Sequence, residues 1–338
     1  MLGGIHDEWE KSDAVYVWGM FLWCLPFVLI ERSFSRRPVI VSPRGMLAAA
    51  AVGQKAAKKR AFLAMVSALG LAETVIHATS IAEAEDVLHR WPRMRVVVVP
   101  NGVEVPEVMP ERDPGATPFV LYLGRLHPYK RVERIIAAFA QAVRWERSDG
   151  RGQKDEGGRA TEASLDPGGR PASGDAPDLR EAWSLVVAGD GEAAYRRDLE
   201  RVASEAGVGA RVRFAGQVSG DEKSRLLAQA EGVVLGSLSE NFGMSVAEAL
   251  AHGTPCVVTK TAPWEGLDRE GCGFWVDDSE EALAAGMRRL MALSPKERWA
   301  MGERGRAWMR REFSWGSVGR RMLALYEELV AERAVRPS

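Results

Sequence analysis

Residues 120–136 read VLYLGRLHPYKRVERII, an apolar run followed by a turn with Pro128 and a helical pattern that begins near Lys130. The same succession of strand and helix recurs along the 338-residue chain. Alternating strands and helices favour a parallel sheet covered by helices on both faces. The sequence therefore predicts an α/β fold built from βαβ units.

Two series of apolar runs lie on either side of a proline-rich connector, residues 103–118. A chain of 338 residues exceeds one ordinary hydrophobic core, so we expect two α/β domains, at residues 1–107 and 118–314. The runs that we interpret as their strands are AVYVW (14–18), PVIVS (38–42), ETVIHA (73–78), RVVVVP (95–100), PFVLYLG (118–124), WSLVVAG (183–189), ARVRFAG (210–216), GVVLGS (232–237) and PCVVTK (255–260).

Two segments lie outside this pattern. Residues 148–180 are mostly Gly, Pro and charged residues, so they cannot bury enough apolar surface and are predicted to form a disordered insertion. Residues 315–334 have the spacing of an amphipathic helix. We expect this helix to pack back on the first domain through Met322, Leu323, Leu325, Tyr326 and Leu329.

Composition excludes several classes of protein. The 45 Lys and Arg residues are balanced by 46 Asp and Glu residues, so the chain lacks the basic excess of a general nucleic-acid-binding protein. Cys24, Cys256 and Cys272 are far apart and odd in number, which favours a reduced cytoplasmic protein without structural zinc. The uncharged residues 14–30 have the length of a very short membrane span, but we favour a strand followed by a buried helix.

Arg125 and Lys130 follow the strand that opens the second domain. Ligands of open parallel sheets bind at the carboxyl ends of strands, and two cations across a turn can close on one diphosphate. A solvated basic helix start is the alternative. Because a lysine is disfavoured at a helix N-terminus, we favour ligand binding.

A glycine turn, Gly189, Asp190 and Gly191, follows the next strand at the same edge of the sheet. Glycine permits close approach of the backbone to a ligand, or supplies a positive φ for a turn. The turn by itself does not decide between these alternatives.

Residues 239–255 read SENFGMSVAEALAHGTP and place Glu240 and Glu248 around the start of an apolar helix. Free backbone N–H groups at a helix N-terminus favour an anion such as phosphate. A carboxylate would repel that anion unless it faces neutral hydroxyls, so the pair suggests a ligand that combines phosphate with sugar. The alternative for Glu248 is a capping box with Ser245, which would stabilise the helix by about 1 kcal/mol.

Together these motifs resemble the retaining glycosyltransferases of family four, whose GT-B fold has two Rossmann-like domains facing a cleft. The motifs that carry the resemblance are GRLHPYK, VVAGDGE, SENFGMSVAEALAHGTP, TAPWEGL, SPRGML (42–47) and VVPNGVE (98–104). The resemblance implies transfer of a sugar from a nucleotide diphosphate sugar to a glycan or lipid-linked acceptor, with retention of anomeric configuration, in envelope or exopolysaccharide biosynthesis. It implies no metal and no other cofactor, because two basic residues neutralise the leaving diphosphate.

The resemblance also implies roles for individual residues. Arg125, Lys130 and Glu240 are implied to be catalytic, and Glu248 to bind the ribose. The implied donor-binding residues are Gly124, Gly189, Asp190, Gly191, Asn241, Phe242, Gly243, Met244, Ser245 and Glu248. The implied acceptor-side residues are Trp18, Arg44 and Gly45.

The sequence departs from the family in its first domain. Trp18 stands where relatives commonly carry a histidine, and a tryptophan cannot accept a proton. Neither His6 nor His127 obviously replaces that histidine. The chain also begins after the first βα units of its relatives, so the first domain is expected to be truncated, with a bare sheet edge open to self-association.

The basic run QKAAKKRAFLAMV (54–66) predicts peripheral contact with the inner face of the membrane, although a solvated helix face is the alternative. Its basic residues and apolar neighbours are Lys55, Lys58, Lys59, Arg60, Phe62 and Leu63. Two rival functions stay open: a GT-B relative that binds nucleotide sugars without turnover, and a GT-B nucleotide-sugar epimerase.

Overall fold

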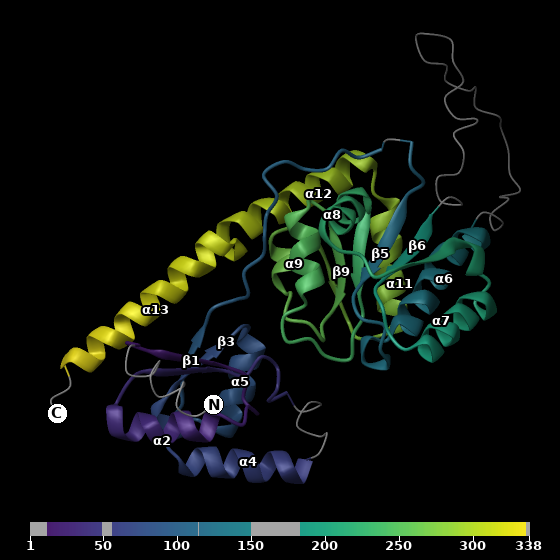
Figure 1. Cartoon of the computed structure of the whole chain (residues 1–338). Coiled ribbons are helices and arrows are strands. Elements are labelled where there is room, and N and C mark those ends of the chain that lie inside the picture. Colours follow the sequence, from purple (N-terminus) through teal and green to yellow (C-terminus); the bar gives the residue numbers. More distant parts are fainter. Residues whose placement is uncertain (1–11, 49–55, 114, 150–182, 336–338) are drawn as a thin grey trace, which may run out of the picture.

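A computed structural model of the chain describes residues 12–48, 56–113, 115–149 and 183–335 (Figure 1). His6 and Lys55 lie outside these ranges, and so does the predicted insertion apart from residues 148 and 149. The nine predicted strands are all present, and the expected α/β architecture of two parallel-sheet domains is confirmed.

The first domain contains a four-stranded parallel sheet in the order β1-β2-β3-β4. Its side chains alternate between two cores: Val39 and Val41 face α2 and α4, whereas Ile40 faces the C-terminal helix. The elements are β1 (Val15–Trp18), α2 (Leu25–Ser35), β2 (Val39–Ser42), α4 (Ala56–Ala68), the 3-10 helix η1 (Leu71–Glu73), β3 (Val75–Ala78), α5 (Ile81–Arg90) and β4 (Arg95–Val98).

The second domain contains a six-stranded parallel sheet in the order β10-β9-β8-β5-β6-β7. Its elements are β5 (Phe119–Leu123), the 3-10 helix η2 (Pro128–Lys130), α6 (Val132–Asp149), β6 (Ser184–Ala188), α7 (Ala193–Glu205), the 3-10 helix η3 (Gly209–Arg211), β7 (Val212–Gly216), α8 (Gly220–Gln229), β8 (Gly232–Leu235), α9 (Met244–Ala251), β9 (Cys256–Thr259), α10 (Gly266–Arg269), β10 (Gly273–Val276), α11 (Glu280–Ala292), α12 (Pro295–Trp308), the π-helix η4 (Met309–Phe313) and α13 (Trp315–Val335). β10 has no counterpart among the predicted strands.

The strand order of the second sheet reverses at β5. β5 pairs with β6 on one side and with β8 on the other, so the chain winds outward first through β6 and β7 and then through β9 and β10. The loops that follow β5 and β8 therefore lead to helices on opposite faces of the sheet, α6 on one face and α9 on the other. Such a reversal is the usual place for a ligand in an open parallel sheet.

The expected strand and helix are present as β1 and α2, but α2 is buried on one side alone. Leu25, Val28 and Leu29 pack into the first core. The outer side carries three exposed apolar residues, Phe27, Ile30 and Phe34, and the exposed Trp23, in the turn before the helix, packs against Phe27. In the described part of the chain, no helix is both long and apolar enough to cross a membrane.

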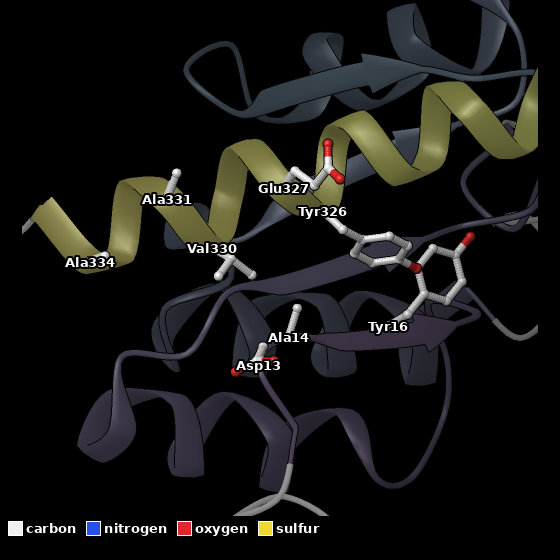
Figure 2. Close-up of a pocket in the computed structure, with 8 residues that line it drawn as sticks. All are labelled: Asp13, Ala14, Tyr16, Tyr326, Glu327, Val330, Ala331 and Ala334. Carbon is white, nitrogen blue, oxygen red and sulfur yellow. The ribbon is translucent and has the colours of Figure 1, made fainter.

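Helix α13 extends from the second domain across the first (Figure 1). Leu325 and Leu329 are buried against Ile40 and Val75, whereas Leu323, which was also expected to dock, is exposed. Figure 2 shows Tyr326 of α13 beside Tyr16 of β1, at a cavity of about 620 Å³ between this helix and the edge strand. The helix thus covers the second face of the first sheet.

Candidate functional site

A cavity of about 670 Å³ lies at the carboxyl ends of β5 and β8, where the strand order reverses. Its walls come from the β5–α6 connection, the loop before α9 and the first turns of α9. The expected catalytic and donor-binding residues that line it are Gly124, Arg125, Lys130, Glu240, Gly243, Met244, Ser245 and Glu248. We call this space the donor cavity.

Arg125 and Lys130 enter the donor cavity from the turn after β5. The ring of His127 caps this turn, because its Nδ1 accepts a hydrogen bond from the Tyr129 N–H at 3.1 Å. Lys130 is the last residue of η2 and does not begin α6. Because Lys130 does not occupy a helix N-terminus, the expectation that its unfavourable position marks a functional residue does not apply to it. Within the described residues, Arg125 is exposed and has no carboxylate partner.

Lys130 and Glu240 form an ion pair across the cavity, with Nζ and Oε1 2.5 Å apart. The Ser237 hydroxyl donates to the same carboxylate oxygen at 2.6 Å. Two donors therefore hold the Glu240 carboxylate in place, and the ion pair orients the Lys130 side chain.

A second ion pair joins Lys223 of α8 to Glu248 of α9, with Nζ and Oε1 3.0 Å apart. This pair overturns the capping-box alternative. Helix α9 already begins at Met244 after the N-cap Gly243, whose φ is +83°, and no side chain caps it. Ser245 thus lies inside the first turn, and Glu248 faces the cavity.

Lys223 was not anticipated from the sequence. It lies in the run DEKSR, which reads as an ordinary charged helix face, and the approach of α8 to α9 is visible in the fold alone. With Lys223, the donor cavity holds three cationic side chains and two carboxylates.

Two expected donor-binding residues have other roles. The Phe242 side chain is buried against Trp264 and Phe313, and its carbonyl accepts a hydrogen bond from the Trp264 indole. Asn241 points to the first domain, where its Nδ2 donates to Thr79 Oγ1 at 2.7 Å. Neither residue lines the donor cavity.

The glycine turn after β6 has a packing reason for its glycines. A Cβ atom on Gly189 would lie 1.8 Å from the Gly124 carbonyl oxygen, and one on Gly191 would lie 2.0 Å from that of Leu126. Gly189, Asp190 and Gly191 do not line the donor cavity. The structure therefore favours the turn, rather than ligand approach, as the explanation of these glycines.

On the acceptor side, Arg44 is held by a chain of polar contacts. Its guanidinium lies 3.8 Å above the Trp18 ring and donates to Asn101 Oδ1 and to the Tyr16 hydroxyl. Tyr16 in turn contacts Nδ1 of the buried His77, at 2.7 Å. Arg44 and Gly45 line a second cavity, which lies between the two domains. Trp18 lines neither this cavity nor the donor cavity.

The described residues contain no group of three or more His, Cys, Asp or Glu side chains placed to hold a metal ion.

The chain is similar to known glycosyltransferases. Residues 174–308 match the family described as Glycosyl transferases group 1. The MMP alpha-(1->4)-mannosyltransferase of Mycolicibacterium hassiacum is 33% identical over 138 residues, which cover 40% of this chain and 33% of that protein. The D-inositol 3-phosphate glycosyltransferase of Salinispora tropica is 29% identical over 283 residues, which cover 77% of this chain and 52% of that protein.

The fold has counterparts among solved structures. The Anabaena protein HepE, solved in complex with UDP, matches with a TM-score of 0.73 at 16% identity, over 96% of this chain and 81% of that chain. The matches to the two curated relatives span 33% and 52% of their length.

Proposed function

Because the chain belongs to the group 1 glycosyltransferases with the GT-B fold, we propose that it transfers a sugar from a nucleotide diphosphate sugar to a glycan or lipid-linked acceptor, with retention of anomeric configuration. The observation that carries this proposal is the donor cavity, where Arg125, Lys130 and Lys223 surround the start of α9 at the strand reversal. The UDP bound to the structurally similar HepE supports a nucleotide as ligand.

The cations would act on the leaving group. As the bond between the sugar and the diphosphate breaks, negative charge grows on the diphosphate oxygens, and fixed cations beside them lower the barrier. Of the three cations of the donor cavity, Arg125 is the one without a carboxylate partner among the described residues, so its guanidinium fork is available to a diphosphate. The N–H groups at the first turn of α9 add partial positive charge.

Glu240 would face the transferred sugar rather than the diphosphate. Its carboxylate already accepts from Ser237 and Lys130, and it lies where the donor cavity meets the space between the domains. A carboxylate at that position can accept hydrogen bonds from sugar hydroxyls. It also orients the Lys130 side chain before the donor enters.

We also propose that the first domain contacts an anionic membrane surface, in keeping with a lipid-linked acceptor. Phe62 and Leu63 of α4 pack into the core, so these residues cannot supply the contact. The exposed apolar side of α2 can, because α2 and α4 lie side by side on the face away from the second domain, where Lys58 and Arg60 are exposed (Figure 1).

The test of the transfer proposal is binding followed by turnover. Calorimetry with UDP and GDP should show micromolar binding of at least one of them, and Arg125→Ala should weaken it by at least about tenfold, the loss expected for one charge-assisted contact. A labelled donor should then yield product with the anomeric configuration of the donor. Binding without product would favour the non-catalytic rival, donor interconversion without acceptor would favour the epimerase, and no binding of either nucleotide would refute the proposal.

A further inference from the structure

A second cavity, of about 470 Å³, adjoins the donor cavity in the space between the two domains. Tyr129 and Glu240 line both cavities, so the second space opens directly onto the place proposed for the transferred sugar. Its first-domain wall comes from the loop after β2 and the start of α5. Its second-domain wall comes from the loops after β8 and β9 and from Trp275 of β10.

The two adjoining cavities have opposite charge. Carboxylates dominate the second cavity, where the acidic side chains are Glu83, Glu85, Asp86, Glu240 and Glu265. Its two basic side chains are Arg44 and Lys260, and both are engaged: Lys260 pairs with Asp277 at 2.6 Å, and Arg44 donates to Asn101. The donor cavity has the reverse balance, with three cations against two carboxylates.

The negative charge of the first-domain wall is built into its structure. Glu83 is buried, and its carboxylate accepts from the Thr79 N–H and hydroxyl, at 2.7 and 2.9 Å, and from the Gly45 N–H at 2.5 Å. Partial burial, reinforced by Glu83 and Glu85, raises the pKa of Asp86. An additional anion placed against this wall would meet carboxylates that are already crowded.

We propose that this second cavity is the acceptor site and that it selects acceptors whose reacting end is an uncharged, hydroxyl-bearing sugar or polyol. The proposal rests on the proposed transferase function and adds the chemical class of the acceptor. Carboxylates accept hydrogen bonds from hydroxyls, and Trp275 adds apolar surface to the lining of the cavity. A phosphate group on the reacting end would be repelled by the same carboxylates, which makes Glu85, Asp86 and Glu265 specificity-determining residues.

Ligand-observed NMR with the full chain, saturated with UDP or GDP, tests this directly without requiring turnover. The probes are methyl α-mannoside with mannose 6-phosphate, and myo-inositol with myo-inositol 3-phosphate. We expect the neutral member of at least one pair to bind at least about tenfold more tightly than its phosphorylated counterpart, as repulsion by several carboxylates requires. Tighter binding of the phosphorylated members, or no binding of any probe, would overturn the inference.

Charge reversal supplies the second arm. Glu85→Lys combined with Glu265→Lys should narrow or invert the preference, whereas Glu104→Lys, an exposed carboxylate of the connector that lines neither cavity, should leave it unchanged. An unchanged preference in the double variant would also overturn the inference. Nucleotide affinity is measured in parallel for each variant, so that loss of donor binding, which would refute the transferase proposal itself, is distinguished from loss of acceptor selectivity.

Discussion

Gly45 of the first domain and Asn241 of the second face each other so closely that no side chain fits between them. A Cβ atom on Gly45 would lie 2.8 Å from Asn241 Cβ, and the φ of Gly45 is +76°. Asn241 also donates to Thr79 Oγ1 at 2.7 Å. These contacts fix how near the acceptor-side loops come to the donor cavity.

Gly45→Ala is expected to reduce transfer while leaving nucleotide binding intact. The new methyl group must push the loop after β2 away from Asn241, and a displacement of about 1 Å at reacting groups can cost up to a hundredfold in rate. We expect kcat to fall at least about tenfold, and the Kd for UDP or GDP to stay the same, because the donor cavity belongs to the second domain. Gly319→Ala is the control, since a Cβ there meets nothing within 4 Å. Equal kcat values for Gly45→Ala and wild type would contradict the role assigned to this contact.

Lys130→Ala is expected to weaken nucleoside diphosphate binding by ten- to a hundredfold. The substitution removes a cation from the diphosphate site and leaves the carboxylate of Glu240 with one fewer donor; a hydrogen bond to a charged group is worth about 1.5–3 kcal/mol. Glu240→Gln should instead keep nucleotide affinity and lower kcat, because it retains the shape but loses a strong acceptor for sugar hydroxyls. Calorimetry and a transfer assay separate the two effects, with the exposed Lys296→Ala as the control. The same affinity for Lys130→Ala and Lys296→Ala would argue against a diphosphate at this site.

Two glycines with positive φ allow backbone strain to be separated from steric overlap. Gly216 has φ +74° and open space around its missing Cβ, so Gly216→Ala should cost about 1–2 kcal/mol of strain alone. Gly189 has φ +145°, and its Cβ would lie 1.8 Å from a backbone oxygen that cannot easily move. Gly189→Ala should therefore lower the free energy of unfolding by more than 3 kcal/mol, or prevent folding. Denaturant unfolding of both variants measures the loss of free energy of unfolding. Similar losses in the two variants would show that the surrounding backbone shifts to remove the overlap at residue 189.

Much of the fold followed from local patterns, because parallel strands buried on both faces are unbroken apolar runs. β10 was not predicted, because GFWV is short and lies between Cys272 and two aspartates. This segment becomes a strand by pairing with β9. Arg125, Lys130 and the two glutamates could be predicted to share a site, because strand ends of one parallel sheet meet at one edge.

Other parts of the site depend on contacts between distant segments and could not be predicted from local sequence. Lys223 reaches Glu248 through the packing of α8 on α9, and Asn241 turns to the first domain because the domains approach there. The side of a helix that stays exposed is equally a tertiary property. The apolar composition of residues 14–30 predicted a buried helix, but it could not show that one side of α2 stays exposed.

Stability is expected to decline as the pH falls below about 6.5, the ordinary pKa of histidine. Burial lowers the pKa of both His77 and His252, so each binds a proton less readily in the folded chain than in the unfolded chain. In the unfolded chain both bind protons below their ordinary pKa, which means that the unfolded state binds more protons and the free energy of unfolding drops with falling pH. Both ring nitrogens of His77 have polar neighbours, because Nε2 contacts the Val99 carbonyl and Nδ1 contacts the Tyr16 hydroxyl, each at 2.7 Å.

His77→Gln should flatten this pH dependence in part, and His77→Gln with His252→Gln should flatten it further. Denaturant unfolding between about pH 7.5 and pH 5.5, the range in which an ordinary histidine titrates, measures how steeply the free energy of unfolding changes with pH. A slope unchanged by the double variant would assign the acid sensitivity to carboxylates instead.

The exposed side of α2 is expected to bind anionic vesicles. Phe27 and Phe34 are 45% and 84% exposed, and burying a large apolar side chain is worth about 1.5–3 kcal/mol, so Phe27→Ser with Phe34→Ser should lower partitioning into phosphatidylglycerol-containing vesicles at least about tenfold. Leu323→Ser is the control, because Leu323 is also exposed but lies on α13. Added salt should weaken binding by wild type, since the exposed Lys58 and Arg60 of α4 are attracted to the anionic headgroups. Two results together would contradict the membrane contact. The double variant would bind vesicles as well as wild type does, and it would abolish a concentration-dependent dimer of wild type in size-exclusion chromatography. Helix α2 would then contact a second copy of the chain instead of a membrane.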